Sequence, residues 1–140
     1  MATELVLYWD ASAIISSLFK DIHSERAWEI SRRDGVHLLS SLALAETHAV
    51  INRLARERLL ADVLIKAALD ALANGPWRYI NISPDQREIA KLAAKWPLRG
   101  ADLWHLSLAI TLQQDLPELS LLTFDNRLLT AAQGEKLSYY

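Results

Sequence analysis

The predicted fold is decided by the stretch Leu5-Val6-Leu7-Tyr8-Trp9-Asp10. Its first five residues are apolar without polar alternation, which is typical of a buried strand in a parallel sheet. The strand ends abruptly at an acidic residue, and helix-forming residues follow from 11 to 19. Ligands of open α/β sheets bind at the carboxyl ends of the strands, so Asp10 stands where a functional residue is expected.

The alternation of strands and helices continues along the chain. Further strands are expected at residues 36–40, 79–82 and 119–124, and residues 136–140 are a candidate for a short edge strand. Helices are expected at residues 23–33, 42–57, 59–73, 100–114 and 126–133. One more helix should begin with Ser83 as its N-cap and Pro84 in its first position, and should end before Pro97. This pattern predicts a single α/β domain, residues 1–140, in which helices cover both faces of a parallel sheet.

Composition limits the class of protein. Hydrophobic residues make up 51% of the 140 residues, which is enough to form the hydrophobic core of one domain. The absence of cysteine excludes disulfides and zinc sites built from thiolates. No apolar run approaches the ~20 residues that span a bilayer, and residues 1–4 lack the basic start of a signal peptide. We therefore expect a cytoplasmic protein. The net charge of −2 gives no support for nonspecific binding of nucleic acid, so any such binding must depend on local clusters of basic residues.

Four acidic residues stand at the same end of the predicted sheet. Asp10 and Asp125 follow the first and fourth strands, whereas Glu46 and Asp102 lie in the first turns of two helices. Two unit charges about 4 Å apart repel by roughly 4 kcal/mol at an effective dielectric of 20, so four converging carboxylates need a counter-charge. A divalent cation supplies it, and hard oxygen ligands favour Mg²⁺ or Mn²⁺. Such a site suits phosphodiester hydrolysis.

Each of these acids also has a structural interpretation. An aspartate at a strand end or helix start is usually a cap, and this interpretation is the better one for Asp102 or Asp125 taken alone. Asp10 follows apolar residues and Glu46 lies in an apolar helix, so both need a partner or a metal. The full set of four is harder to explain by capping than any one member.

Four stretches of the sequence resemble the PIN-domain nucleases, and most closely the VapC-type ribonuclease toxins. They are YWDASA at residues 8–13, Ala45-Glu46, RGADLWHL at residues 99–106 and LTFDNRLL at residues 122–129. The third and fourth, in this order, are the specific ones. The resemblance covers nearly the whole chain.

The resemblance implies a three-layer α/β/α sandwich and single-strand RNA cleavage without a covalent intermediate. It implies that Mg²⁺ or Mn²⁺ is held by Asp10, Glu46, Asp102 and Asp125, with Ser12 supporting the first aspartate and Asn126 as a further supporting residue. It also implies a homodimer and a cognate antitoxin that blocks the active site.

Basic and aromatic residues add weaker expectations. Arg53, Arg99 and Arg127 are candidates for binding the RNA backbone, although most such residues simply face solvent. His105 lies one turn after Asp102 and is expected to make a hydrogen bond in a packed interior, rather than to act as a general acid or phosphate contact. Trp9 is expected in the core, and the other four tryptophans are expected to pack rather than to stack on bases.

Three other functions remain open to the sequence. One is a PIN nuclease for RNA maturation that has no antitoxin. Another is a phosphatase of the haloacid-dehalogenase type, but that chemistry needs a second aspartate where Ser12 stands. The last is an inactive RNA- or protein-binding module, which the presence of all four acids argues against.

Overall fold

The structure is a computed structural model that describes residues 4–140. Residues 1–3, on which part of the expectation about a signal peptide rests, lie outside the described residues. The described chain forms one parallel sheet of four strands in the order β3-β2-β1-β4. Their bounds are Leu5–Trp9 for β1, Gly35–Ser40 for β2, Trp77–Ile80 for β3 and Leu119–Leu122 for β4.

Helices separate the strands along the chain. The first four are α1 (Ala11–Leu18), α2 (Ser24–Ser31), α3 (Ser41–Arg56) and α4 (Asp62–Asn74). The last three are α5 (Gln86–Lys95), α6 (Gly100–Asp115) and α7 (Asn126–Gly134). None of the helices in residues 4–140 combines the length and apolarity needed to cross a bilayer.

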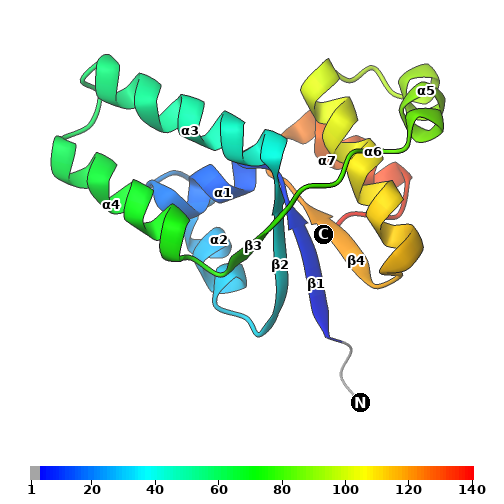
Figure 1. Cartoon of the computed structure of the whole chain (residues 1–140), viewed down its shortest axis with the longest axis horizontal. Helices are drawn as coiled ribbons and strands as arrows, with labels where there is room; N and C mark the ends of the chain where they lie inside the picture. The colour runs from blue at the N-terminus through cyan, green and yellow to red at the C-terminus, as the bar shows by residue number, and fades with distance from the viewer. Residues whose placement is uncertain (1–3) are drawn as a thin grey trace.

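The helices form two layers, one on each side of the sheet (Figure 1). The alternation of β1 explains this arrangement, because successive side chains of a strand point to opposite faces. Leu7 and Trp9 belong to the core beneath α1 to α4, whereas Val6 and Tyr8 belong to the core beneath α5, α6 and α7. The predicted three-layer α/β/α sandwich with a central parallel sheet is confirmed.

The strand order creates a crevice at the end of β1. From β1 the chain moves outward to β2 and β3 on one side, whereas β4 pairs with β1 on the other side. In open α/β sheets such a switch of direction leaves a gap at the carboxyl ends of the strands, which is where ligands bind. Residues that follow β1 and β4 therefore meet at this gap.

The boundaries of the two outer predictions for strands were wrong by a few residues. β3 begins at Trp77 rather than at residue 79, because Trp77 pairs with His37 and its ring packs edge-on against Trp9. β4 ends at Leu122 rather than at residue 124, because the next residue turns its side chain towards Asp10. The expected edge strand at the C-terminus is reduced to a single bridge between Leu121 and Ser138.

The predicted N-cap at Ser83 was also wrong. Helix α5 begins at Gln86, and its cap is Asp85, whose carboxylate accepts a hydrogen bond from the Arg87 backbone N–H. The Asp85 backbone N–H donates to Thr111 on α6 at 3.0 Å. This contact with another helix holds Asp85 at the cap position, and Pro84 is buried before it.

Candidate active site

Asp10 lies directly after β1 and caps helix α1. Its side chain is only 3% exposed, yet both carboxylate oxygens have donors. Oδ1 accepts from the Ser12 hydroxyl at 2.7 Å and from the Ala13 backbone N–H at 2.9 Å, and Oδ2 accepts from the Thr123 hydroxyl at 2.5 Å. Burial raises the pKa of Asp10, and the hydrogen bonds from Thr123, Ser12 and Ala13 act against that rise.

Two hydroxyl groups tie the end of β1 to the end of β4. Ser12 donates to Asp10 and accepts from the Phe124 backbone N–H at 3.0 Å. Thr123 likewise donates to Asp10 and accepts from the Asp125 backbone N–H at 3.1 Å. The expected contact between Ser12 and Asp10 is present. Thr123 was not singled out from the sequence, where its signal was a polar residue closing an apolar strand.

Glu46 reaches the same gap from helix α3. Its Oε1 lies 2.5 Å from His105 Nε2, and His105 Nδ1 lies 2.6 Å from the Tyr8 hydroxyl. The Tyr8 hydroxyl in turn lies 2.7 Å from the hydroxyl of Ser40, the N-cap of α3. A chain of hydrogen bonds therefore runs from the start of α3, through β1 and α6, back to Glu46.

One arrangement of protons gives every group in this chain of hydrogen bonds a partner. Ser40 accepts from the Ala43 backbone N–H, so its hydroxyl proton is free to donate to Tyr8. Burial raises the pKa of Tyr8, so its hydroxyl keeps the proton it donates to His105 Nδ1. With Nδ1 accepting from Tyr8, His105 carries a proton on Nε2, where it donates to the Glu46 carboxylate.

His105 is buried in a packed interior, as expected from the sequence, at 1% exposure. Its hydrogen bond with Glu46 was not predicted, because it joins residues on two helices far apart in the chain.

The tryptophans mostly pack, as expected. Trp9 is fully buried, and Trp77, Trp96 and Trp104 pack partly buried against the two cores. Trp28 is the exception at 42% exposure.

Asp102 and Asp125 complete the acidic group. Asp102 lies in the first turn of α6, and Asp125 caps α7 by accepting from the Leu128 backbone N–H at 3.0 Å. Partial burial raises the pKa of Asp102, and the negative charges of Asp125 and Asp10 raise it further. The capping expected for Asp125 is therefore present, together with electrostatic coupling among the acids.

One cavity of about 250 Å³ gathers all four acids. Its lining includes Asp10, Glu46, Asp102 and Asp125 together with Ser12 and His105. The oxygen-rich lining suits a hard divalent cation. Within residues 4–140, however, no three acidic or histidine side chains lie close enough to enclose an ion by themselves. This spacing is compatible with Mg²⁺, which commonly keeps several waters and uses only one or two carboxylates.

A second hollow, of about 330 Å³, adjoins the first. Asp102 and Asp125 line both, and the second is completed by Arg99, Asn126 and Arg127. Two of the three arginines expected to contact substrate therefore stand beside the acids, as does Asn126. Arg53 is exposed on α3 and lines neither of these two hollows.

The fold, the crevice and the clustered acids define a known class of protein. The sequence profile of the PIN domain matches residues 7–134. The chain belongs to the PIN-domain family of nucleases. A comparison with curated proteins found no match.

Several solved structures have a similar fold. PAE2754 from Pyrobaculum aerophilum has a TM-score of 0.63 and 19% identity, over 93% of this chain and 81% of that chain. VapC20 from Mycobacterium tuberculosis, a sarcin–ricin loop cleaving toxin, has a TM-score of 0.57 and 16% identity, over 89% and 94%. VapBC2 from Rickettsia felis, bound to a DNA fragment from its promoter, has a TM-score of 0.58 and 15% identity, over 86% and 100%. At these identities the likeness concerns the fold.

Proposed function

We propose that this PIN-domain protein is an endoribonuclease that depends on Mg²⁺ or Mn²⁺. The observation that carries the proposal is the single cavity at the end of β1, in which four carboxylates from four elements meet beside two arginines. A bound ion would neutralise the acids and lower the pKa of the water that attacks the phosphodiester bond.

The residues divide into three roles in this proposal. Asp10, Glu46, Asp102 and Asp125 would surround the metal, one or two of them binding it directly and the others through its waters. Ser12 and Thr123 orient Asp10 through its two oxygens, and His105 orients Glu46. Arg99 and Arg127 contact phosphate groups of the substrate, and Asn126 supports Asp125 at the start of α7. Arg53 lies outside this hollow, so any contact it makes is with a more distant part of the RNA.

We further propose that the protein is the toxin of a toxin–antitoxin pair in the cytoplasm and acts as a homodimer. Two of the similar folds carry VapC or VapBC in their names, which supports the pair. A feature of this chain supports a protein partner: a groove of about 570 Å³ runs between α1, α3 and α4. Leu59 and Leu64, which line it, are 61% and 52% exposed, and Val63 beside them is 72% exposed. Large apolar side chains exposed together commonly mark a partner site.

Cleavage of single-stranded RNA by the purified protein tests the chemistry. We expect cleavage with Mg²⁺ or Mn²⁺ and none in excess EDTA. Asp10→Asn should lower the rate by about 100-fold or more while keeping the fold, because the amide retains the cap at Oδ1 but removes the charge. The matched control is Asp70→Asn, an exposed residue of α4. Full activity in EDTA, or an Asp10→Asn variant as active as the wild type, would contradict the proposal.

Expression in a bacterial host separates a toxin from a nuclease of RNA maturation. A toxin should arrest growth, and co-expression of the small open reading frame next to its gene should restore growth. Sequencing the 5′ ends of RNA fragments after brief induction identifies the target. Normal growth with a demonstrably active enzyme would instead favour the maturation function.

A further inference from the structure

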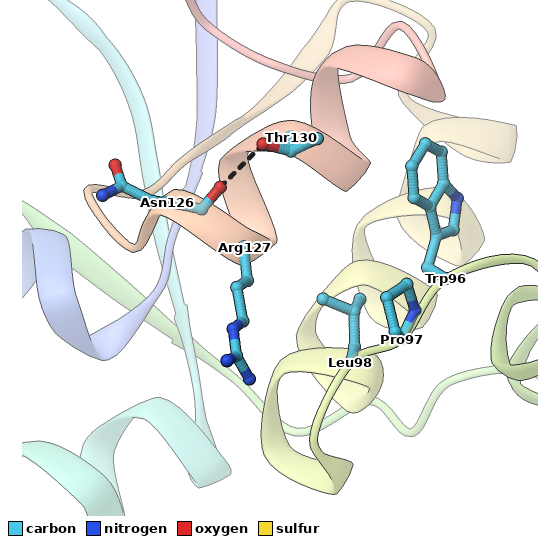
Figure 2. A pocket seen from close by; sticks show the side chains of 6 residues that line it. All are labelled: Trp96, Pro97, Leu98, Asn126, Arg127 and Thr130. Atoms are coloured by element: carbon cyan, nitrogen blue, oxygen red, sulfur yellow. Dashed lines mark hydrogen bonds between the residues drawn. The ribbon is translucent and has the colours of Figure 1, made fainter.

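An apolar pocket of about 630 Å³ lies beside the two arginines. One wall is the connection between α5 and α6, and the other is the first two turns of α7 (Figure 2). We call it the Trp96 pocket; its lining residues are Trp96, Pro97, Leu98, Asn126, Arg127 and Thr130. Trp96, Pro97, Leu98 and Thr130 have no role in the carboxylate chemistry described above.

The Trp96 pocket continues the row of hollows that begins at the acids. It shares Asn126 and Arg127 with the arginine-lined hollow, which in turn shares Asp102 and Asp125 with the carboxylate cavity. In Figure 2 the Arg127 side chain extends from α7 alongside this pocket, whereas that of Asn126 turns away from it. An extended ligand could therefore occupy acids, arginines and apolar pocket in succession.

The three hollows are lined in succession by acidic, basic and apolar side chains, and this order suits the groups of one RNA strand. A strand whose cleaved phosphate lies at the carboxylates would bring a neighbouring phosphate to Arg99 and Arg127. A base attached next to that phosphate is flat and apolar on both faces, and it is the part of the strand that suits an aromatic and aliphatic pocket. Arg127 lines both the apolar pocket and the arginine-lined hollow, so a ligand that carries a phosphate next to an apolar group suits the two hollows together.

The aromatic wall of the pocket is held in place before any ligand arrives. The Trp96 indole N–H donates to Glu135 Oε2 at 2.9 Å, and Lys95 Nζ lies 2.7 Å from the same oxygen. The far edge of the ring packs against Gly134, where an added Cβ would lie 2.3 Å from Trp96 Cη2. A wall that is already ordered loses little conformational freedom when a ligand binds.

We propose that the Trp96 pocket binds one nucleobase of the RNA strand, next to the phosphate held by Arg99 and Arg127. The inference rests on the proposed ribonuclease function and adds to it a site that contributes to substrate choice. Stacking tolerates every base, so the pocket contributes affinity and position first, and selects among bases through its shape.

A scan with abasic nucleotides tests the pocket. The probe is a fluorescently labelled RNA decamer centred on the cleavage site mapped in cells, and binding is measured by anisotropy in EDTA, where the proposed hydrolysis stops. The blocking variant is Thr130→Phe, which fills the pocket from an exposed helix position whose hydroxyl donates to the Asn126 carbonyl. The matched control is Gln133→Phe, exposed on the same helix but outside the pocket lining.

The wild type should bind the decamer about five- to tenfold more weakly when one particular base next to the cleaved phosphate is missing. Thr130→Phe should bind the intact decamer with a similar loss and should no longer respond to that abasic position. Gln133→Phe should behave as the wild type. Melting temperatures of both variants establish that each is folded.

Three results would overturn the inference. If RNA is cleaved and bound but the abasic profile of the wild type is flat, the pocket takes no base and the nuclease proposal stands. If Thr130→Phe weakens capture of the antitoxin while its RNA profile matches the wild type, the occupant is a protein side chain. If no RNA is cleaved or bound at all, the proposed function fails and this inference fails with it.

Discussion

His105 Nε2 lies 2.5 Å from Glu46 Oε1, and this contact joins the acidic cavity to the buried interior of the sheet. Behind His105 stands Tyr8, which is fully buried on β1, and behind Tyr8 stands Ser40 at the start of α3. Glu46 is therefore positioned by groups that lie within the core. A substitution at the buried end of this chain of hydrogen bonds should therefore change the position of Glu46 in the cavity.

Removing only the Tyr8 hydroxyl tests this connection. Tyr8→Phe leaves His105 Nδ1 buried without a donor and Ser40 without an acceptor, so the free energy of unfolding should fall by about 1–3 kcal/mol. Cleavage should also slow, because His105, the partner of Glu46, is no longer held by Tyr8. The control is Tyr79→Phe, since the Tyr79 side chain is 55% exposed. Urea denaturation that gives equal stability for both variants would show that the chain of hydrogen bonds adds nothing.

Asp102→Asn tests the repulsion among the acids. Burial and the charges of Asp125 and Asp10 raise the pKa of Asp102, which means that the ionised carboxylate destabilises the folded chain at neutral pH when no metal is bound. The variant should therefore melt at or above the wild-type temperature in EDTA. Added Mg²⁺ should raise the melting temperature of the wild type more than that of the variant, because a ligand of the native state stabilises it by mass action.

Asp34→Asn, an exposed residue in the turn between α2 and β2, is the control for this measurement. It should change neither the melting temperature in EDTA nor the response to Mg²⁺. A clear loss of stability for Asp102→Asn in EDTA, with an unchanged response to Mg²⁺, would identify Asp102 as a helix-start residue that only interacts with the dipole of α6.

We expect the interactions of Glu135 to stabilise the folded protein less at acid pH than at neutral pH. Its bonds with Lys95 and Trp96 lower its pKa in the folded chain relative to the unfolded chain. An acid with a lowered folded pKa contributes stability above its unfolded pKa of about 4.3, and the contribution disappears as the pH falls through the folded value. The difference in unfolding free energy between wild type and Glu135→Gln should therefore be constant near neutral pH and shrink below about pH 4.

Chemical denaturation at a series of pH values measures this difference. Glu118→Gln, an exposed residue in the loop before β4, serves as the matched control and should show little difference from the wild type at any pH. A difference for Glu135→Gln that does not change with pH would mean that packing, rather than charge, accounts for the effect.

Gly35→Ala should destabilise the sheet at the start of β2. Gly35 has a φ of +150°, and a Cβ there would lie 2.4 Å from the Leu5 carbonyl oxygen on the paired strand β1. Because this oxygen belongs to the backbone, the strands must shift, and the free energy of unfolding should fall by at least about 2 kcal/mol. Gly100→Ala is the control, since nothing lies within 4 Å of its added Cβ. Similar melting temperatures for the two variants would contradict this account.

Local sequence patterns were sufficient for the elements that surround the site. The apolar run of β1 and the acid directly after it predict a buried strand and a residue at its carboxyl end, because a strand buried on both faces has no polar alternation. The same reasoning places Asp125 near the end of β4, and Glu46 and Asp102 in the first turns of their helices. These positions depend on neighbours a few residues away, so the sequence contains the information needed to predict them.

Contacts between distant residues decided the rest. Thr123 bonds to Asp10 across 113 residues and His105 to Glu46 across 59, and no local pattern indicates either pair. The start of α5 at Asp85 depends on Thr111, and the start of β3 at Trp77 depends on His37 and Trp9. Each of these features is stabilised by a partner that only the folded chain brings near. The sequence therefore specified which acids stand at the strand and helix ends, whereas tertiary packing decided which side chains hold them in place.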